Sequence, residues 1–290
     1  MAITASLVKE LRERTGSGMM ECKKALVESD GDIEAAAELM RKSGAARADK
    51  KAGRVAADGA IKVIVTGDRK TAVILEVNSE TDFVAKDDNF QSFTEAVLQT
   101  VLQQRPSSVE ALISLSIADG QTVEEARQAL IAKVGENIQI RRFQIVESDQ
   151  GVSSYLHGTR IGVLVDSSAA AEMGRDIAMH VAAVNPQFVN EQAVPAEFIE
   201  KEKDILIAQA QDSGKPPEII EKMIQGRLKK FLAEVTLVEQ PFVKDPEQTV
   251  GKLLAGAGAS ISGFIRYEVG EGIEKKVEDF AAEVASQLNS

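Results

Sequence analysis

Residues 71–98 read TAVILEVNSETDFVAKDDNFQSFTEAVL, and this stretch decides how the chain folds. It begins with a strand-like run rich in β-branched residues, Thr71–Val77, and ends in a helical pattern that starts at Phe90 and stops before Pro106. A polar, acidic corner, Ser79–Asp87, separates the two. Strand and helix therefore follow each other closely, which predicts a fold that mixes both.

A second part of the chain repeats this order of elements. The strand-like run Ile161–Val165 leads to a helical pattern around Ile177 that stops before Pro186. The central strand leucine lies 31 residues before the closing proline in the first copy (Leu75) and 22 before it in the second (Leu164). We assign the nine-residue difference to the acidic corner. Because strands and helices mix without a regular βαβ rhythm, we predict an α+β fold with an internal repeat.

Phe83 is the unusual residue of the acidic corner. Loops lie at the surface because their backbone groups need water, so a large apolar side chain there either folds back as a local anchor or is offered to a partner. Single exposed apolar residues are common and uninformative, which favours the anchor. The second copy of the repeat closes without the corner, so the fold does not require Phe83. Both interpretations stay open on this reasoning.

Composition limits the class of protein. The 290 residues suggest about two domains, and the net charge of −11 argues against nonspecific binding to nucleic acid or anionic membranes. One cysteine, Cys22, and two histidines, His157 and His180, allow neither an internal disulfide nor a Cys/His zinc site. The start of the chain lacks the features of a signal or transit peptide, and no apolar stretch is long enough to span a membrane. We expect a cytoplasmic protein with no cofactor and no metal.

Residues 1–54 predict a small bundle of three helices. Asp32 is a natural N-cap for the third helix, which we expect over Ile33–Ser43 with Gly44 closing it. We expect Ala45–Ala57 to be a basic linker. The predicted core of the bundle is Leu7, Leu11, Ala25, Leu26, Ile33 and Leu39.

The adjacent residues Met19 and Met20 follow Gly18 at the start of the second helix. Neighbours on a helix point about 100° apart, so both cannot face one small core, and we expect one of them to be exposed. Met is both a common gap-filler and adaptable at binding surfaces, so a core role and a contact role both remain open.

The remaining patterns complete a five-part division. Two amphipathic segments within Pro195–Glu234 predict an antiparallel helical hairpin, and Gly272–Leu288 predicts a terminal helix. The predicted parts are 1–54, the helical bundle; 55–145, the first repeat; 146–186 with 231–270, the second repeat; 187–230, the inserted hairpin; and 271–290, the terminal helical module.

A search for catalytic patterns finds no Walker A motif and no dinucleotide-binding glycine loop in the sequence. His157 and His180 have no partner at catalytic spacing, which favours structural roles. Asp82, Asp87 and Asp88 are suited either to Mg²⁺ or to the start of a helix, where carboxylates interact well with the macrodipole. The sequence therefore favours a binding protein over an enzyme.

Two long motifs give the chain a resemblance to a known family. Residues 11–26 read LRERTGSGMMECKKAL and residues 76–86 read EVNSETDFVAK. With shorter matches along the whole chain, among them GENI at 135–138 and YLHG at 155–158, they closely resemble bacterial elongation factor Ts.

The resemblance implies a guanine-nucleotide exchange factor that binds elongation factor Tu in its GDP-bound and nucleotide-free forms. It implies that the helical bundle, similar to ubiquitin-associated domains, and the terminal helix both contact the partner's GTPase domain, and that the Asp82-Phe83 pair inserts near the partner's Mg²⁺ and phosphate site. It also implies that His157 meets a further domain of the partner and that the hairpin serves self-association in some members, so a homodimer is possible. The implied contact residues are Thr81, Asp82, Phe83, Val84, Arg12, Met19, Met20, Gly135, Glu136, Asn137 and His157.

Two other classes remain as alternatives. A nucleotide-dependent enzyme would need phosphate-binding glycines and would itself bind GDP. A passive scaffold or ubiquitin-type adaptor would bind a partner without changing nucleotide release.

Overall fold

The computed structural model describes residues 3–15, 17–211 and 216–274. Its contacts divide the chain into two compact units. Unit 1 comprises 1–62, 75–144 and 268–290, and unit 2 comprises 63–74 and 145–267. The five-part division drawn from the sequence stays a prediction, and residues 275–290 of the predicted terminal helix lie outside the described residues.

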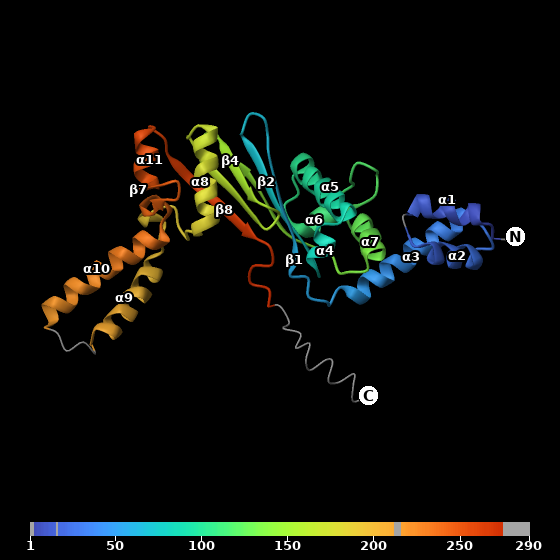
Figure 1. Cartoon of the computed structure of the whole chain (residues 1–290), viewed down its shortest axis with the longest axis horizontal. Helices are drawn as coiled ribbons and strands as arrows, with labels where there is room; N and C mark the ends of the chain where they lie inside the picture. The colour runs from blue at the N-terminus through green and yellow to red at the C-terminus, as the bar shows by residue number, and fades with distance from the viewer. Residues whose placement is uncertain (1–2, 16, 212–215, 275–290) are drawn as a thin grey trace. The chain divides into compact units, whose positions relative to one another are not determined.

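The N-terminal part is a bundle of three helices, α1 (Ala5–Thr15), α2 (Met19–Glu28) and α3 (Ile33–Lys51) (Figure 1, blue). The Asp32 carboxylate accepts hydrogen bonds from the backbone N–H groups of Glu34 (2.9 Å) and Ala35 (3.0 Å), so the predicted N-cap is confirmed. The buried side chains of its core are Val8, Leu11, Cys22, Ala25, Leu26 and Ala36, with the other predicted core residues packed around them.

Helix α3 is longer than predicted, because Gly44 does not end it. The helix continues to Lys51 and takes up the first half of the expected linker. Gly44 is buried, and a Cβ added to it would lie 3.5 Å from Ala132 of α7 (Val123–Val134), against which α3 packs. A helical glycine costs about 1 kcal/mol relative to alanine, which this close packing offsets.

The first sheet has the order β1-β2-β3, formed by β1 (Asp58–Val65), β2 (Thr71–Ser79) and β3 (Gln139–Glu147). Between β2 and β3 the chain forms the helices α4 (Asp82–Ala85), α5 (Asp88–Gln104), α6 (Val109–Ile113) and α7. The side chains of β2 are buried from Ala72 to Ser79. The mixture of separate helices and sheets confirms the α+β fold class.

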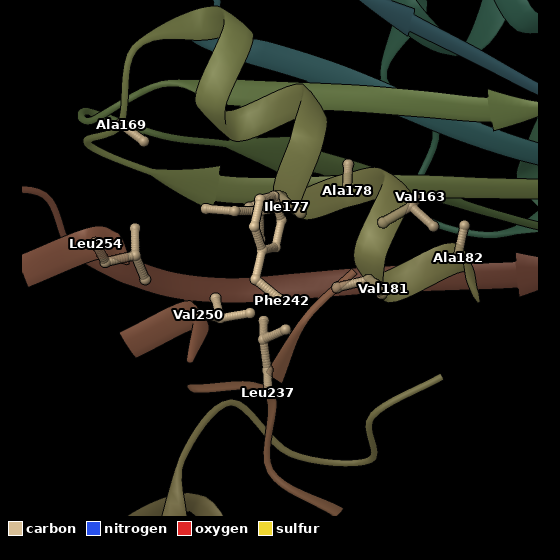
Figure 2. Packing of buried hydrophobic residues seen from close by; sticks show 11 residues of the cluster. Val163, Ala169, Ile177, Ala178, Val181, Ala182, Leu237, Phe242, Val250 and Leu254 are labelled. Carbon is tan, nitrogen blue, oxygen red and sulfur yellow. The ribbon is translucent and has the colours of Figure 1, made fainter. Parts of the chain in front are cut away.

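The second sheet has the order β4-β5-β8, formed by β4 (Val152–His157), β5 (Ile161–Ser167) and β8 (Ile261–Glu268). Strands β4 and β5 pair antiparallel. Helix α8 (Ala171–Val184) packs on both. Figure 2 shows the core of this part, where the ring of Phe242 extends toward α8.

Gly174 allows α8 to lie close against β4. A Cβ on Gly174 would lie 2.2 Å from the Ser153 Oγ and 2.8 Å from the Ser153 Cβ. Gly174→Ala should therefore lower the free energy of unfolding by about 1–3 kcal/mol, as overpacking does. Urea unfolding followed by circular dichroism measures this change.

Two further variants test the same contact. Adding Ser153→Gly to Gly174→Ala should recover part of the lost stability, because it removes both clashing atoms. Gly226 of α10 (Pro217–Val235) is the matched control, since no atom lies within 4 Å of its added Cβ. Gly226→Ala should stabilise by about 0.5–1 kcal/mol. A loss of stability in the control and none at Gly174 would contradict the packing argument.

A helical hairpin is inserted after α8. Helix α9 (Ala196–Gln211) packs against α10, and the two share a small core of Leu206, Ala210 and Ile224. The short helices η1 (Glu191–Ala193) and η2 (Leu237–Glu239) flank the hairpin, and β6 (Pro241–Phe242), β7 (Asp245–Thr249) and α11 (Val250–Gly256) lead to β8. Self-association through the hairpin stays a prediction.

The two copies of the repeat differ in length at more than one place. Eight residues separate β2 from α5, and three separate β5 from α8. Helix α5 has 17 residues and α8 has 14, so the longer helix and a longer strand end account for the rest of the nine-residue difference. Assigning all nine residues to the corner was therefore wrong, because the spacing from leucine to proline also counts the helix. The added corner holds the extra helix α4.

Candidate interaction site

The acidic corner folds as the single-turn helix α4. Thr81 is its N-cap, and the Thr81 Oγ1 accepts a hydrogen bond from the Val84 N–H at 3.4 Å. Phe83 is 82% exposed, the largest exposed fraction among the large apolar side chains in the described part of the chain. The local-anchor interpretation of Phe83 is therefore wrong. Val84 is half-buried, and Ala85 is the residue of α4 that faces the core.

Charged side chains surround Phe83 on α4. Asp82 pairs with Lys86 at 2.7 Å across one turn, and both side chains are more than half exposed. Such a surface pair contributes little to stability. The corner thus combines an exposed aromatic ring with an accessible carboxylate.

The turn after α7 holds the start of this corner. Gly135 closes α7 in the left-handed conformation (φ 80°), and Glu136 follows. The Glu136 carboxylate accepts hydrogen bonds from the Thr81 N–H (3.0 Å) and the Thr81 hydroxyl (2.7 Å). Asn137 is fully buried, and its N–H donates to the Glu80 carboxylate at 2.6 Å. The structure therefore brings together two motifs that lie more than fifty residues apart.

The strand that leads into the corner carries a buried carboxylate. Glu76 accepts hydrogen bonds from Arg141 (2.9 Å), Arg142 (2.6 Å), the Asn78 amide (3.1 Å) and the Gly270 N–H (2.8 Å). Burial alone would raise the pKa of Glu76, but these hydrogen bonds outweigh it and hold the pKa below its usual value. The signal for this site in the sequence is a charged residue within the apolar run 72–77.

The other acids of the corner begin helices. Asp87 is the N-cap of α5, and its carboxylate accepts the N–H of Asn89 at 2.9 Å. Hydrogen bonds from Asn89 lower the pKa of Asp87. Asp88 lies in the first turn of α5. Within residues 3–15, 17–211 and 216–274, no group of three or more His, Cys, Asp or Glu side chains is arranged to hold a metal ion.

A second exposed apolar surface lies on the helical bundle. Met19 is 59% exposed and Met20 is 75% exposed, so both side chains are exposed where the sequence predicted one. Both lie in the first turn of α2. Together with Arg12 and Val8 of α1, they line a shallow apolar groove.

The two histidines, both in unit 2, differ in burial. His157 ends β4 and is exposed, with its Nδ1 3.3 Å from the Tyr155 hydroxyl. His180 is fully buried in α8. Its Nδ1 accepts the Val243 N–H (3.2 Å), so its Nε2 carries the proton and donates to Gln240 (2.9 Å). Burial lowers the pKa of His180, which is a neutral structural residue.

The predicted site residues thus occupy three separate places. The corner and the turn after α7 form one cluster, Arg12 with Met19 and Met20 forms a second on the bundle, and His157 lies in unit 2. Their contacts with a partner stay predictions. No helix in the described ranges is long and apolar enough to cross a membrane.

Comparisons with known proteins agree with the motifs. The family model described as Elongation factor TS matches residues 80–271, which include α4, the turn after α7 and the hairpin. The chain is 61% identical to elongation factor Ts of Thioalkalivibrio sulfidiphilus over 290 residues, which cover 99% of each chain. It is 60% identical to elongation factor Ts of Alkalilimnicola ehrlichii, again over 99% of each, and 59% identical to that of Methylococcus capsulatus over the full length of both. The chain therefore belongs to the elongation factor Ts family, whose members act in translation elongation.

Proposed function

We propose that this chain is a guanine-nucleotide exchange factor, that it binds elongation factor Tu and that it promotes release of GDP. The observation that carries the proposal is the exposed Phe83 on a one-turn helix whose backbone is tied to the rest of unit 1. An aromatic ring held in this way is suited to insert between elements of another protein, because large aromatic side chains contribute much of the energy of protein interfaces.

Exchange requires that the factor bind the nucleotide-free partner more tightly than the GDP-bound partner. By linkage, the affinity of the complex for GDP is then lower by the same ratio. Phe83 would supply this difference by entering a gap that widens when the partner's phosphate-binding region moves. Asp82 would add a negative charge beside the metal site and weaken the hold on Mg²⁺. Neither residue performs bond chemistry, so the protein would act as a binding protein in the cytoplasm and not as an enzyme.

The exposed residues of the bundle would enlarge the interface. Met19 and Met20 are unbranched, polarisable side chains that adapt to a partner's surface, and Arg12 lies beside them. The exposed His157 of unit 2 would provide a further contact. The excess negative charge disfavours direct binding of nucleic acid or anionic membranes.

The test is release of a fluorescent GDP analogue from elongation factor Tu with and without this chain. We expect faster release as the chain is added, with saturation at high concentration. Unchanged release with detectable binding would indicate an adaptor and refute the exchange function. Equilibrium dialysis of the chain alone against GDP should detect no binding, and binding there would favour a nucleotide-dependent enzyme.

A further inference from the structure

Two carboxylates connect the segment that follows β2 with the turn after α7, and each segment supplies one of them. Glu136 accepts hydrogen bonds from the N–H and hydroxyl of Thr81, and Glu80 accepts one from the N–H of Asn137. Each carboxylate therefore binds a backbone N–H of the other segment. Hydrogen bonds to a carboxylate are about twice as strong as those between neutral groups. We call these four residues the carboxylate latch.

The turn after α7 is the fixed side of the carboxylate latch. The Lys51 ammonium at the end of α3 donates a hydrogen bond to the Gly135 carbonyl. The side-chain amide of Asn137 donates to the carbonyls of Arg54 (2.8 Å) and Ala52 (3.4 Å). Since the turn has its own hydrogen bonds to the end of α3 and the residues that follow it, the turn can serve as an anchor for the corner.

Helix α4 is the side of the carboxylate latch that needs support. A helix of four residues has almost no internal hydrogen bonds, and its nucleation is unfavourable. The Thr81 hydroxyl accepts the Val84 N–H and donates to Glu136, so the cap of α4 depends on the Glu136 carboxylate. At the other end, the Gln91 side-chain amide donates to the Ala85 carbonyl at 2.5 Å. Contacts from outside the helix therefore set its direction.

The direction of α4 decides where Phe83 points, because the exposed ring has little packing of its own. We propose that Glu136 is a positioning residue, which together with Glu80 holds α4 so that Phe83 is presented to the partner in its bound orientation. The proposal rests on the proposed exchange function. It gives Glu136 a different role from the direct contact expected from the sequence, since both carboxylate oxygens are engaged with Thr81. Holding a binding element in its bound form strengthens association by lowering the entropy lost on binding.

The first test is the concentration dependence of GDP release. Glu136→Ala should lower the maximal rate of stimulated release by about tenfold and leave the half-saturating concentration of this chain nearly unchanged, because Phe83 enters the partner only while the nucleotide site is open and the cost of ordering α4 is paid in that state. Glu95→Ala removes an exposed glutamate of α5 and serves as the matched control. A raised half-saturating concentration with an unchanged maximal rate would overturn the proposal.

The second test observes position 83 directly and needs no partner. The sequence contains no tryptophan, so Phe83→Trp introduces a single indole at the site. Adding Glu136→Ala to this variant should give the indole a large, fast component in time-resolved fluorescence anisotropy, while circular dichroism and the thermal midpoint stay the same. If Glu136→Ala itself unfolds the chain, Thr81→Val removes the hydroxyl part of the same contact and should have the same effect on the indole.

The two tests together separate the possible outcomes. Weakened exchange with unchanged anisotropy would mean that Glu136 contacts the partner directly, which overturns the positioning role. If Glu136→Ala makes the indole more mobile but the unmodified chain does not stimulate GDP release, the exchange function is refuted and the carboxylate latch is supported.

Discussion

Replacing Phe83 with alanine should reduce the maximal stimulated rate of GDP release by about thirtyfold, which corresponds to the roughly 2 kcal/mol typical of an interface hot spot. The ring is 82% exposed in the free chain, so its apolar surface is available to be buried in a complex. If the ring enters a gap that exists only while the nucleotide site is open, its loss removes stabilisation from that state alone. The maximal rate should therefore fall more than the affinity for the GDP-bound partner.

The stability of the chain should hardly change in the Phe83→Ala variant, because surface substitutions are usually within about 0.5 kcal/mol. Ile219 provides a matched control, since it is a large apolar residue on α10 that is 48% exposed. Ile219→Ala should leave GDP release unchanged. The measurement is stopped-flow fluorescence at saturating concentrations of each variant. Equal maximal rates for Phe83→Ala and the unmodified chain would refute the wedge role, even if the chain accelerates release.

Local patterns in the sequence predicted much of the fold because they depend on neighbouring residues. The Asp32 cap needs only the N–H groups that follow it, and the helical periodicity of the bundle needs only spacing. Gly44 misled the prediction because its role depends on Ala132, 88 positions away. A glycine that ends a helix and a glycine that lets two helices approach are identical in the sequence.

The site was predictable in its parts and not in its connections. The motif around Phe83 indicated a contact, yet only the structure decided between a buried and an exposed ring. Nothing in the spacing of Thr81 and Glu136 indicates that they share two hydrogen bonds, since their pairing depends on how α7 ends beside β2. Long-range polar contacts of this kind leave no periodic pattern in a sequence.

Replacing Glu76 with glutamine should lower the free energy of unfolding of unit 1 by about 3 kcal/mol, near the lower end of what breaking a buried ion pair costs. Glutamine keeps the shape but loses the charge, and its NH₂ group would face a guanidinium donor of Arg141 or Arg142. Both arginines are partly exposed, at 26% and 31%, so water can replace some of the lost contacts. The Gly270 N–H would also lose part of its charged acceptor.

The dependence on pH distinguishes the charge of Glu76 from its packing. The folded pKa of Glu76 lies below its ordinary value of 4.5, so the folded chain binds this proton less readily than the unfolded chain. The stabilisation from the charge should therefore be complete above about pH 4.5 and should decline as the pH falls through the folded pKa. Other carboxylates with lowered pKa values also destabilise the chain in acid, so the useful quantity is the difference in unfolding free energy between the unmodified chain and Glu76→Gln.

Urea unfolding and hydrogen exchange of the β2 amides should give the same difference at pH 7 and pH 5 and a smaller one at pH 4. Glu38→Gln, which removes an exposed pair with Lys42, should change little at any of these values. A difference that stays constant down to pH 4 would mean that packing, and not the buried charge, makes Glu76 important for the strand that carries the corner.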